Sequence, residues 1–338
     1  MGLKKLSICI PSFNRAAFLP DLLQSILSQY DPRVEVVVCD NGSQDETEAL
    51  MAKWQEAYSW IVYERLEKNI GPDLCIVKSI EKASGEYCWL MGDDDIIERQ
   101  GLSTVLKALE EEFPDITGMT VNRRAYDFSL QTSWMEKGVL TRKKDQLFLE
   151  ATSCFEELFP LFGFLSSQVV KRDLWRQAVN QEGEKLFLKC NAYLLIYLIG
   201  RMIQQDPYWL YLHTPCVGWR SGNDSFAKQL GVYGRFTLDV IGYEEVAASL
   251  FTKDSLLYRK SLNQVCSSHL LAHIRALKWK GFMKGLYIKT IVLCFSRLKN
   301  SCFFWTLLLP TLLAPVWFLK GLRFVYHRWQ LLDGEGKS

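Results

Sequence analysis

Residues 6–13 read LSICIPSF, and this short apolar stretch decides how the first third of the chain is interpreted. It is rich in apolar and β-branched side chains and lacks regular alternation with polar ones. Similar runs follow at residues 34–40, 61–66, 87–91 and 116–121. Continuous apolar runs of this length are typical of strands that are buried on both faces, as in a parallel sheet.

Helical signals separate these runs. From Leu19 onward, apolar residues follow the i, i+3, i+4, i+7, i+8 spacing of an amphipathic helix. The run Ser43-Gln44-Asp45-Glu46 has the pattern of a capping box, and Pro72 suits the first turn of a further helix. Strand and helix therefore alternate, which predicts an α/β fold with an open, mostly parallel sheet flanked by helices. Further along, we expect a helix through Tyr193–Met202 and a mainly helical region at 226–280.

Composition excludes several classes of protein. Of 338 residues, 49% are hydrophobic and 23% are charged, which is ordinary for a globular chain and excludes disorder, collagen-like repeats and a disulfide-dense miniprotein. The ten cysteines show no metal-ligand spacing, so we expect buried free thiols and no zinc site built on cysteines. The sequence also lacks a P-loop, a G-x-G-x-x-G fingerprint and a G-x-S-x-G elbow. No signal-peptide core precedes Pro11, which predicts a cytoplasmic body.

Charge is distributed unevenly along the chain. Residues 255–332 contain no Asp or Glu but hold twelve of the 40 Lys and Arg residues. The remainder keeps 28 basic residues against all 38 acidic ones, a net charge of −10. We therefore divide the chain into a catalytic domain at 1–225 and a helical, apolar and basic C-terminal region at 226–338.

The end of this region predicts contact with a membrane. Twenty uncharged residues separate Lys299 from Lys320, but Pro310 and Pro315 interrupt them. A single span would also place basic residues on both sides of the bilayer. We therefore favour an interfacial segment at about 282–330, with aromatic side chains at headgroup depth and basic side chains on an anionic surface. The alternative is a buried helical hairpin that packs on the body.

Polar clusters follow the predicted strands at their carboxyl ends. They are Pro11–Arg15, Asp40–Ser43, the loop Lys68–Asp73 and Gly92–Asp95. Ligands of open α/β sheets bind beyond the carboxyl ends of the strands, so these clusters are expected to converge on one crevice.

The three consecutive aspartates 93–95 are the most informative cluster. Adjacent carboxylates repel one another, and a divalent cation such as Mg²⁺ or Mn²⁺, bridging to substrate phosphates, would offset that repulsion. The alternative is a solvated acidic turn that caps the next helix. Asp40 is a single carboxylate at a strand tip, suited to a ribose or a base edge, or alternatively to ordering the Asp-Asn-Gly-Ser turn.

Three of these segments together resemble the family 2 glycosyltransferases: LSICIPSFNR at 6–15, VVVCDNGS at 36–43 and the aspartate triplet. The resemblance covers roughly residues 5–125 and implies the glycosyltransferase A fold, a nucleotide-sugar donor and a divalent metal. It implies that the donor is bound by Pro11, Ser12, Asn14, Arg15, Asp40, Asn69, Gly71 and Asp93. Asp94 and Asp95 are then the expected ligands of the cation. Family members often read Asp-x-Asp-Asp, and Gly92 stands where the first of those aspartates would be, so the division of roles within the triplet is open.

The second half of the chain departs from the family pattern. Many members carry a Glu-Asp pair that supplies the general base, but residues 189–192 contain no carboxylate. The remaining candidates are Glu182, Glu184, Asp206 and Asp224. Of these we nominate Asp224 as the base, with Glu184 as a further catalytic candidate, and Arg220 to neutralise the departing diphosphate. The alternative for Arg220 and Asp224 is a structural turn with an Arg–Asp pair. Residues 216–226 are also similar to transferases that add deoxy sugars to lipid-linked O-antigen intermediates.

The predicted function is metal-dependent transfer of a hexosyl or deoxysugar group from a nucleotide sugar, with inversion implied by the resemblance. The expected acceptor is a hydroxyl of a glycan on polyprenyl diphosphate. We expect a peripheral or monotopic protein on the cytoplasmic face of the inner membrane, active in O-antigen-like polysaccharide synthesis, with no nucleic-acid partner. Two rival functions are a nucleotidyltransferase acting on a sugar phosphate and a membrane-associated scaffold with a degenerate nucleotide site.

Overall fold

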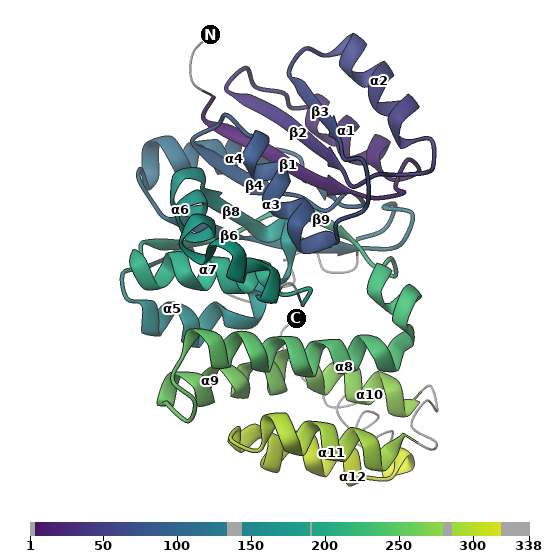
Figure 1. Cartoon of the computed structure of the whole chain (residues 1–338), viewed down its shortest axis with the longest axis vertical. Helices are drawn as coiled ribbons and strands as arrows, with labels where there is room; N and C mark the ends of the chain where they lie inside the picture. The colour runs from purple at the N-terminus through teal and green to yellow at the C-terminus, as the bar shows by residue number, and fades with distance from the viewer. Residues whose placement is uncertain (1–3, 134–143, 190, 280–285, 319–338) are drawn as a thin grey trace, which may run out of the picture. The chain divides into compact units, whose positions relative to one another are not determined.

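The computed structural model describes residues 4–133, 144–189, 191–279 and 286–318. Their contacts divide the chain into two compact units, Met1–Asp224 and Ser225–Ser338. The first unit contains the sheet, and the second is helical (Figure 1). The catalytic and membrane roles expected of the parts 1–225 and 226–338 remain predictions.

A nine-stranded sheet forms the centre of the first unit. Its order is β3-β2-β1-β4-β8-β6-β9-β5, with β7 paired to β9. The strands are β1 Leu6–Ser12, β2 Val34–Asp40, β3 Ile61–Arg65, β4 Tyr87–Leu90, β5 Ile96–Ile97, β6 Gly118–Tyr126, β7 Gln146–Phe148, β8 Gln168–Lys171 and β9 Trp209–Arg220. The pairs β1–β2, β1–β4 and β2–β3 are parallel, whereas β8 pairs antiparallel with both β4 and β6. A further parallel pair joins β6 to β9, so the predicted α/β fold with a mostly parallel sheet is confirmed.

Helices flank the sheet in the alternation that the sequence predicts. In the first unit they are α1 Leu19–Leu27, α2 Thr47–Ala57, α3 Pro72–Lys82, α4 Gly101–Lys107, α5 Ala151–Leu158, α6 Arg172–Glu182 and α7 Leu194–Gln205. Short 3₁₀ or π-helical segments complete the set at Ala108–Glu112, Phe159–Gly163, Leu165–Ser167 and Gly183–Lys189. The prediction of a capping box at residues 43–46 is wrong in detail. The helix begins at Thr47, whose amide donates to Asp45, while Ser43 accepts a hydrogen bond from Asn14.

Side chains that alternate along the parallel strands fill both faces of this sheet. Ile8 and Val36 join the cluster that also holds Leu22 and Leu23 of α1, all fully buried. On the strands, Cys9 and Cys39 are also fully buried, and the thiol of Cys75 on α3 donates to the Cys39 carbonyl at 3.3 Å. Burial on both faces is why the strands read as continuous apolar runs.

The second unit is built from helices. They are α8 Ser225–Leu250, α9 Leu256–Gln264, the π-helical turn η5 Val265–Leu270, α10 Leu271–Trp279, α11 Tyr287–Leu298, the π-helical turn η6 Phe304–Leu308 and α12 Leu309–Leu313. Gly231, with φ of 71°, interrupts α8, and Ser255 caps α9 by accepting from the Tyr258 amide. The region expected to be mainly helical at 226–280 is helical over most of its described length.

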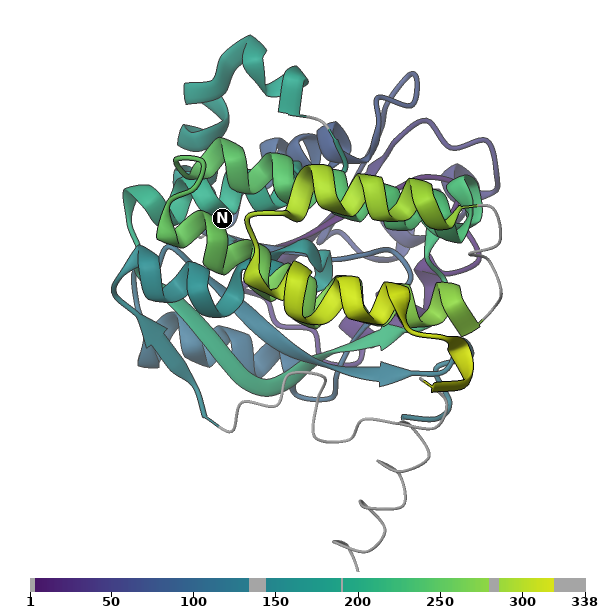
Figure 2. The same cartoon turned by 90° about the horizontal axis from the view of Figure 1, so that it is seen from below.

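The apolar stretch after Lys299 forms helical segments with one buried side. Phe304, Leu308 and Leu312 are fully buried, whereas Trp305 and Leu313 are exposed. This stretch lies beside α11 (Figure 2). In the described part of the chain, no helix combines the length and apolar character needed to cross a bilayer. Of the predicted segment at 282–330, residues 282–285 and 319–330 lie outside the described residues.

Candidate functional site

The carboxyl ends of β1 and β2 lie side by side. The register pairs Ser12 at the end of β1 with Asp40 at the end of β2, and Cys9 with Leu90 at the end of β4. All three strands are parallel, so the loops that follow them leave the sheet at one edge. The geometry therefore brings the expected polar clusters to the same place.

The loop after β1 is fastened to the loop after β2 through Asn14. Its backbone amide donates to Ser43 Oγ at 2.8 Å, and its side-chain Oδ1 accepts from the Gln44 amide at 2.7 Å. Asn14 adopts a positive φ of 55°, a conformation that asparagine tolerates better than most residues. Pro11 and the buried Ser12 precede this turn on the same strand end.

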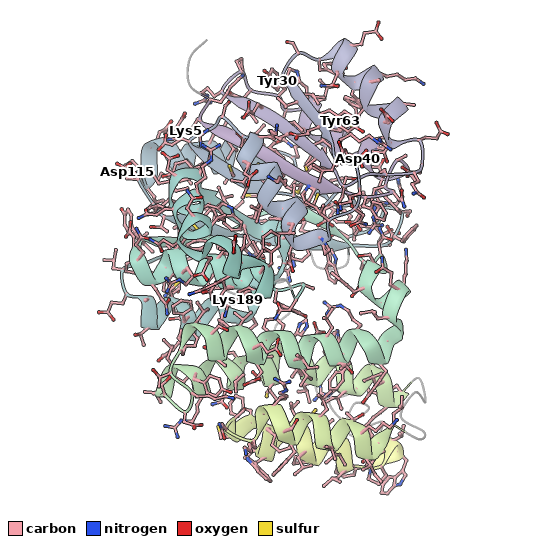
Figure 3. The ribbon with its side chains drawn as sticks, viewed as in Figure 1. Lys5, Tyr30, Asp40, Tyr63, Asp115 and Lys189 are labelled. Carbon is pink, nitrogen blue, oxygen red and sulfur yellow. The ribbon has the colours of Figure 1, made fainter. Side chains whose placement is uncertain are left out.

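Asp40 is fully buried at the end of β2. Its Oδ1 accepts from the Ser43 amide at 2.8 Å, and its Oδ2 accepts from the Tyr63 hydroxyl at 2.6 Å (Figure 3). Burial and the hydrogen bond to Asp40 raise the pKa of Tyr63, which keeps this hydroxyl a donor. Asp40 therefore orders the turn at residues 40–43, and its contact with a nucleotide base stays a prediction.

Asn41 connects this turn to the loop before α3. Its Nδ2 donates to Asn69 Oδ1 at 3.0 Å, and its Oδ1 accepts from the Ile70 amide at 2.9 Å. Asn69 Oδ1 also accepts from the Gly71 amide at 2.8 Å, where φ of 89° favours glycine. The loop that carries Asn69 and Gly71 is thus held against the end of β2 by a side chain that the sequence analysis did not single out.

The three aspartates after β4 have different partners. Asp93 lies 3.5 Å from Arg15 Nε, measured to Oδ1. Asp94 Oδ2 accepts from Asn223 Nδ2 at 2.6 Å. Asp95 accepts from Ser166 Oγ at 2.5 Å through Oδ2 and from the Arg220 amide at 3.0 Å through Oδ1. Segments far apart in the sequence therefore meet at the triplet.

Negative charge accumulates in this cluster. Burial and the neighbouring charge of Asp94 raise the pKa of Asp93 to about 7, although Arg15 opposes the shift. The same two causes raise the pKa of Asp95 to about 7, against the hydrogen bond from Ser166. The protein thus compensates these carboxylates only partly. Such a donor set fits a divalent cation with a preference for oxygen ligands.

Arg220 is buried and its guanidinium bonds within the protein. It donates to the Asp94 carbonyl at 2.8 Å, to the Phe128 carbonyl at 2.7 Å and to Asp21 Oδ2 at 2.6 Å. Its carboxylate partner is therefore Asp21 of α1, which the sequence analysis did not name. The geometry assigns Arg220 to holding the aspartate loop, and its action on a departing diphosphate stays a prediction.

The two carboxylates nominated for catalysis differ in position. Asp224 is exposed and directly follows Asn223, the residue that binds Asp94. Glu184 is exposed in the 3₁₀ segment Gly183–Lys189, and no hydrogen bond or ion pair joins it to the aspartate triplet among the described residues. Asp224 is therefore the better placed of the two, and both roles stay predictions.

Arg123 is a further cation beside the cluster. Its guanidinium carbon lies 3.9 Å from the centre of the Phe164 ring and 5.9 Å from that of Trp219. The charge of Arg123 also lowers the pKa of Asp95. The sequence analysis missed it because it ended the strand at residue 121, whereas β6 continues to Tyr126 along β9.

The family comparison agrees with this arrangement. The model of glycosyl transferase family 2 matches residues 7–163, which include β1 to β4 and the aspartate triplet. Residues 7–163 are thus similar to the family 2 glycosyltransferases, the family that the sequence motifs indicated. The resemblance that the sequence indicated is therefore confirmed.

Curated relatives of this chain are glycosyltransferases. The abequosyltransferase RfbV of Salmonella typhimurium is 28% identical over 270 residues, which are 75% of this chain and 78% of that protein. A GalNAc(5)-diNAcBac-PP-undecaprenol beta-1,3-glucosyltransferase of Campylobacter jejuni is 29% identical over 159 residues, 46% of this chain and 51% of that protein.

Solved structures share the fold at low sequence identity. TarS 1-349 of S. aureus in complex with UDP aligns with a TM-score of 0.56 and 17% identity, over 80% of this chain and 75% of that one. The mannosyltransferase PcManGT of Pyrobaculum calidifontis, in complex with GDP-Man and Mn²⁺, aligns with a TM-score of 0.52 and 14% identity. The alignment covers 86% of this chain and 80% of that one. These matches confirm the glycosyltransferase A fold.

Proposed function

We propose that this glycosyltransferase moves a hexosyl or deoxysugar group from a nucleotide sugar to a hydroxyl of a glycan on polyprenyl diphosphate, in the synthesis of an O-antigen-like polysaccharide. The observation that carries the proposal is the meeting of the loops after β1, β2 and β4 around buried aspartates. The relatives support the acceptor class, because one is named an abequosyltransferase and another acts on an undecaprenol-linked glycan.

The donor would lie at this edge of the sheet. Pro11, Ser12, Asn14, Arg15, Asp40, Asn69 and Gly71 would line the nucleotide pocket, and Asp93 would contact the ribose or the diphosphate. A divalent cation, Mn²⁺ or Mg²⁺, would be held by Asp94 and Asp95 and would stabilise charge on the leaving diphosphate. The raised pKa of Asp95, about 7, supports a cation there because burial leaves this carboxylate poorly compensated. Arg123 would add positive charge on the same side.

The acceptor must lose a proton as its hydroxyl oxygen attacks the anomeric carbon. Asp224 is our candidate for the base, because it is exposed next to Asn223 and can meet an acceptor from solvent. One displacement of this kind inverts the anomeric configuration. Glu184 is the second candidate, with the weaker placement.

The helical unit would hold the enzyme at the cytoplasmic face of the inner membrane. Ile288, Val292 and Phe295 follow helical spacing on α11 and are exposed, with Ile288 at 76%. Residues 255–332 add basic charge with no acidic residue, which suits anionic lipid. Both reactants would then be concentrated at one surface.

A donor screen tests the proposed reaction. Full-length protein is heated with a panel of nucleotide sugars, with and without Mn²⁺, and the melting temperature is recorded. A donor that binds the folded state must raise that temperature, and we expect one nucleotide class to do so only with Mn²⁺. The same donor should then be consumed with a polyprenyl-diphosphate acceptor, and Asp95→Asn should reduce kcat/KM more than about a hundredfold.

Two outcomes would contradict the proposal. Release of pyrophosphate from a nucleoside triphosphate and a sugar phosphate would identify a nucleotidyltransferase. If Asp95→Asn binds the donor and Mn²⁺ as well as the wild-type protein does, the aspartate triplet is not part of the donor site. Glu86→Gln, a half-exposed carboxylate paired with Lys5 at the opposite end of β4, is the matched control and should keep wild-type activity.

A further inference from the structure

Three side chains of the helical unit, none of them used in the proposed reaction, converge on one another. Asp239 of α8 is fully buried, and its Oδ2 lies 3.1 Å from His269 Nε2 and 2.9 Å from His273 Nδ1. The three ligand atoms lie within 4.8 Å of one another. His269 lies near the end of the π-helical turn η5, and His273 lies one helical turn further along, in α10.

The contacts are spaced as in a metal site. Zinc binds imidazole nitrogen and carboxylate oxygen at about 2.0–2.2 Å, so neighbouring ligands of a tetrahedral ion lie about 3.3 Å apart. The separations of 2.9 and 3.1 Å are close to that value, and the two ring nitrogens lie within 4.8 Å of each other. His269 Nε2 is buried and finds no hydrogen bond of regular geometry in the described residues, although it faces Asp239. Replacing this contact by an ion would therefore break no hydrogen bond of regular geometry at Nε2.

The surroundings favour one class of ion. Arg235, one turn before Asp239 on α8, contacts Oδ1 and leaves Oδ2 facing the two rings. The side chains of His269 and His273 are 29% and 33% exposed, so the cluster lies near the surface, and a water molecule would supply the fourth ligand of a bound ion. Two imidazoles and one carboxylate suit borderline ions such as Zn²⁺ more than Mg²⁺ or Ca²⁺.

We propose that Asp239, His269 and His273 bind Zn²⁺ or a similar first-row transition-metal ion, which links α8 to the helix formed by η5 and α10. This ion would stabilise the helical unit and is separate from the cation of the sugar donor. The proposal does not depend on glycosyltransferase activity, because the three ligands all lie within residues 225–338.

The test uses the full-length chain without an affinity tag, freed of metal by chelation. We expect the wild-type protein to bind one Co²⁺ with the visible absorption of a nitrogen-ligated ion, and Zn²⁺ to displace it. A hundredfold excess of Zn²⁺ over its Kd should raise the melting temperature by about 3–5 °C. Asp94→Asn with Asp95→Asn should leave this signal in place.

Histidine variants show whether the metal ion binds at His269 and His273 or at another histidine of the chain. His269→Gln with His273→Gln should weaken Zn²⁺ binding more than about a hundredfold, since outer-shell partners alone are worth tenfold or more. The chain's other histidines, His213 and His327, provide matched controls as His213→Gln and His327→Gln, which should bind normally. His213 is a stringent control because it also contacts an aspartate, Asp145, yet it belongs to no three-ligand cluster among the described residues.

A measurement on the wild-type chain covers the case in which the double variant does not fold. Diethylpyrocarbonate should modify His269 and His273 in the metal-free protein and spare both when Zn²⁺ is bound, as read by mass spectrometry. The proposal is overturned if the wild-type chain binds no stoichiometric Co²⁺ or Zn²⁺, or if Zn²⁺ leaves the modification of both rings unchanged.

Discussion

At the scale of single residues, Ser166 shows how the site depends on distant parts of the chain. Its hydroxyl donates to Asp95 at 2.5 Å and accepts from the Gly92 amide at 2.9 Å, so one side chain fixes both ends of the aspartate loop. Ser166 is itself buried, so we expect it to act through Asp95. It is a positioning residue for a carboxylate that we assign to the cation.

Replacing Ser166 by alanine should therefore weaken cation use more than turnover. We expect Ser166→Ala to raise the Mn²⁺ concentration for half-maximal activity about tenfold, because partners that orient a metal ligand typically contribute that much. The measurement is a Mn²⁺ titration of initial rates at saturating donor, which separates activation from kcat. Ser103→Ala, an exposed serine on α4, is the control. If Ser166→Ala needs the same Mn²⁺ concentration as the wild-type protein for half-maximal activity, Ser166 does not position the cation ligand.

The sequence could not reveal Ser166, for a physical reason. Asp93, Asp94 and Asp95 are adjacent and follow a buried strand, so their mutual repulsion is evident from the sequence alone. Ser166 comes 71 positions after Asp95 and meets it only because β8 pairs with β4. Side chains that act through tertiary contacts leave no local pattern. Asp21 is hidden in the same way, since it reads as an ordinary acidic residue in the first turn of α1.

At the scale of elements, Asp73 couples α3 to α7. It lies in the first turn of α3, and its Oδ2 accepts from the Ala192 amide at 2.8 Å, just before α7 begins at Leu194. Burial raises the pKa of Asp73 to about 6, although the amides of Ala192 and Leu194 oppose the shift. Ionised Asp73 is therefore less stable in the folded protein than in the unfolded chain.

This shift in pKa predicts that Asp73→Asn increases the stability of the folded protein by an amount that depends on pH. Because the folded-state pKa exceeds the unfolded value, the folded state gains stability from the bound proton at low pH and loses it as pH rises through about 6. Asparagine avoids that loss and can still accept from the Ala192 amide. We expect the variant to be more stable than wild type by about 2–3 kcal/mol at pH 8 and by much less at pH 4.5.

Urea unfolding of both proteins at pH 4.5, 6 and 8 measures this difference. Asp173→Asn is the control, since that carboxylate lies at the corresponding place on α6 with its side chain 81% exposed. A free-energy difference between Asp73→Asn and wild type that stays constant across the three pH values would contradict the argument.

Elements differed in how well the sequence predicted them. The expected runs at 6–13, 34–40, 61–66 and 87–91 match β1 to β4 within two residues, because strands buried on both faces carry an uninterrupted apolar signal. The later strands β7, β8 and β9 gave no such signal. β7 and β8 are three and four residues long, and β9 mixes polar and aromatic side chains over twelve residues. Their placement depends on pairing between distant segments.

At the scale of the whole molecule, the uneven charge along the chain predicts a binding behaviour. The full-length protein should sediment with vesicles that contain phosphatidylglycerol and much less with neutral vesicles. Ile288→Glu with Val292→Glu should reduce binding at least about tenfold, because it puts two charges on the exposed apolar face of α11. Added salt should weaken wild-type binding, since it screens the basic residues.

A substitution in the sheet-containing unit controls for general effects of added charge. Leu149→Glu changes an apolar side chain that is 66% exposed, and vesicle binding should stay at the wild-type level. Binding that survives in the α11 variant, or that resists about 0.5 M salt in the wild-type chain, would argue against an interfacial, electrostatic association.

The free thiols of the chain have a practical consequence. Of the nine described cysteines only Cys302 is exposed, and burial raises the pKa of both Cys266 and Cys294 to about 12. A thiol-alkylating reagent should therefore label Cys302 at once and reach the other eight described cysteines only when the surrounding structure opens. Because Cys88 lies in the sheet and Cys294 in α11, the labelling rates of their peptides would report the opening of each unit separately, within a single reaction and without any engineered probe.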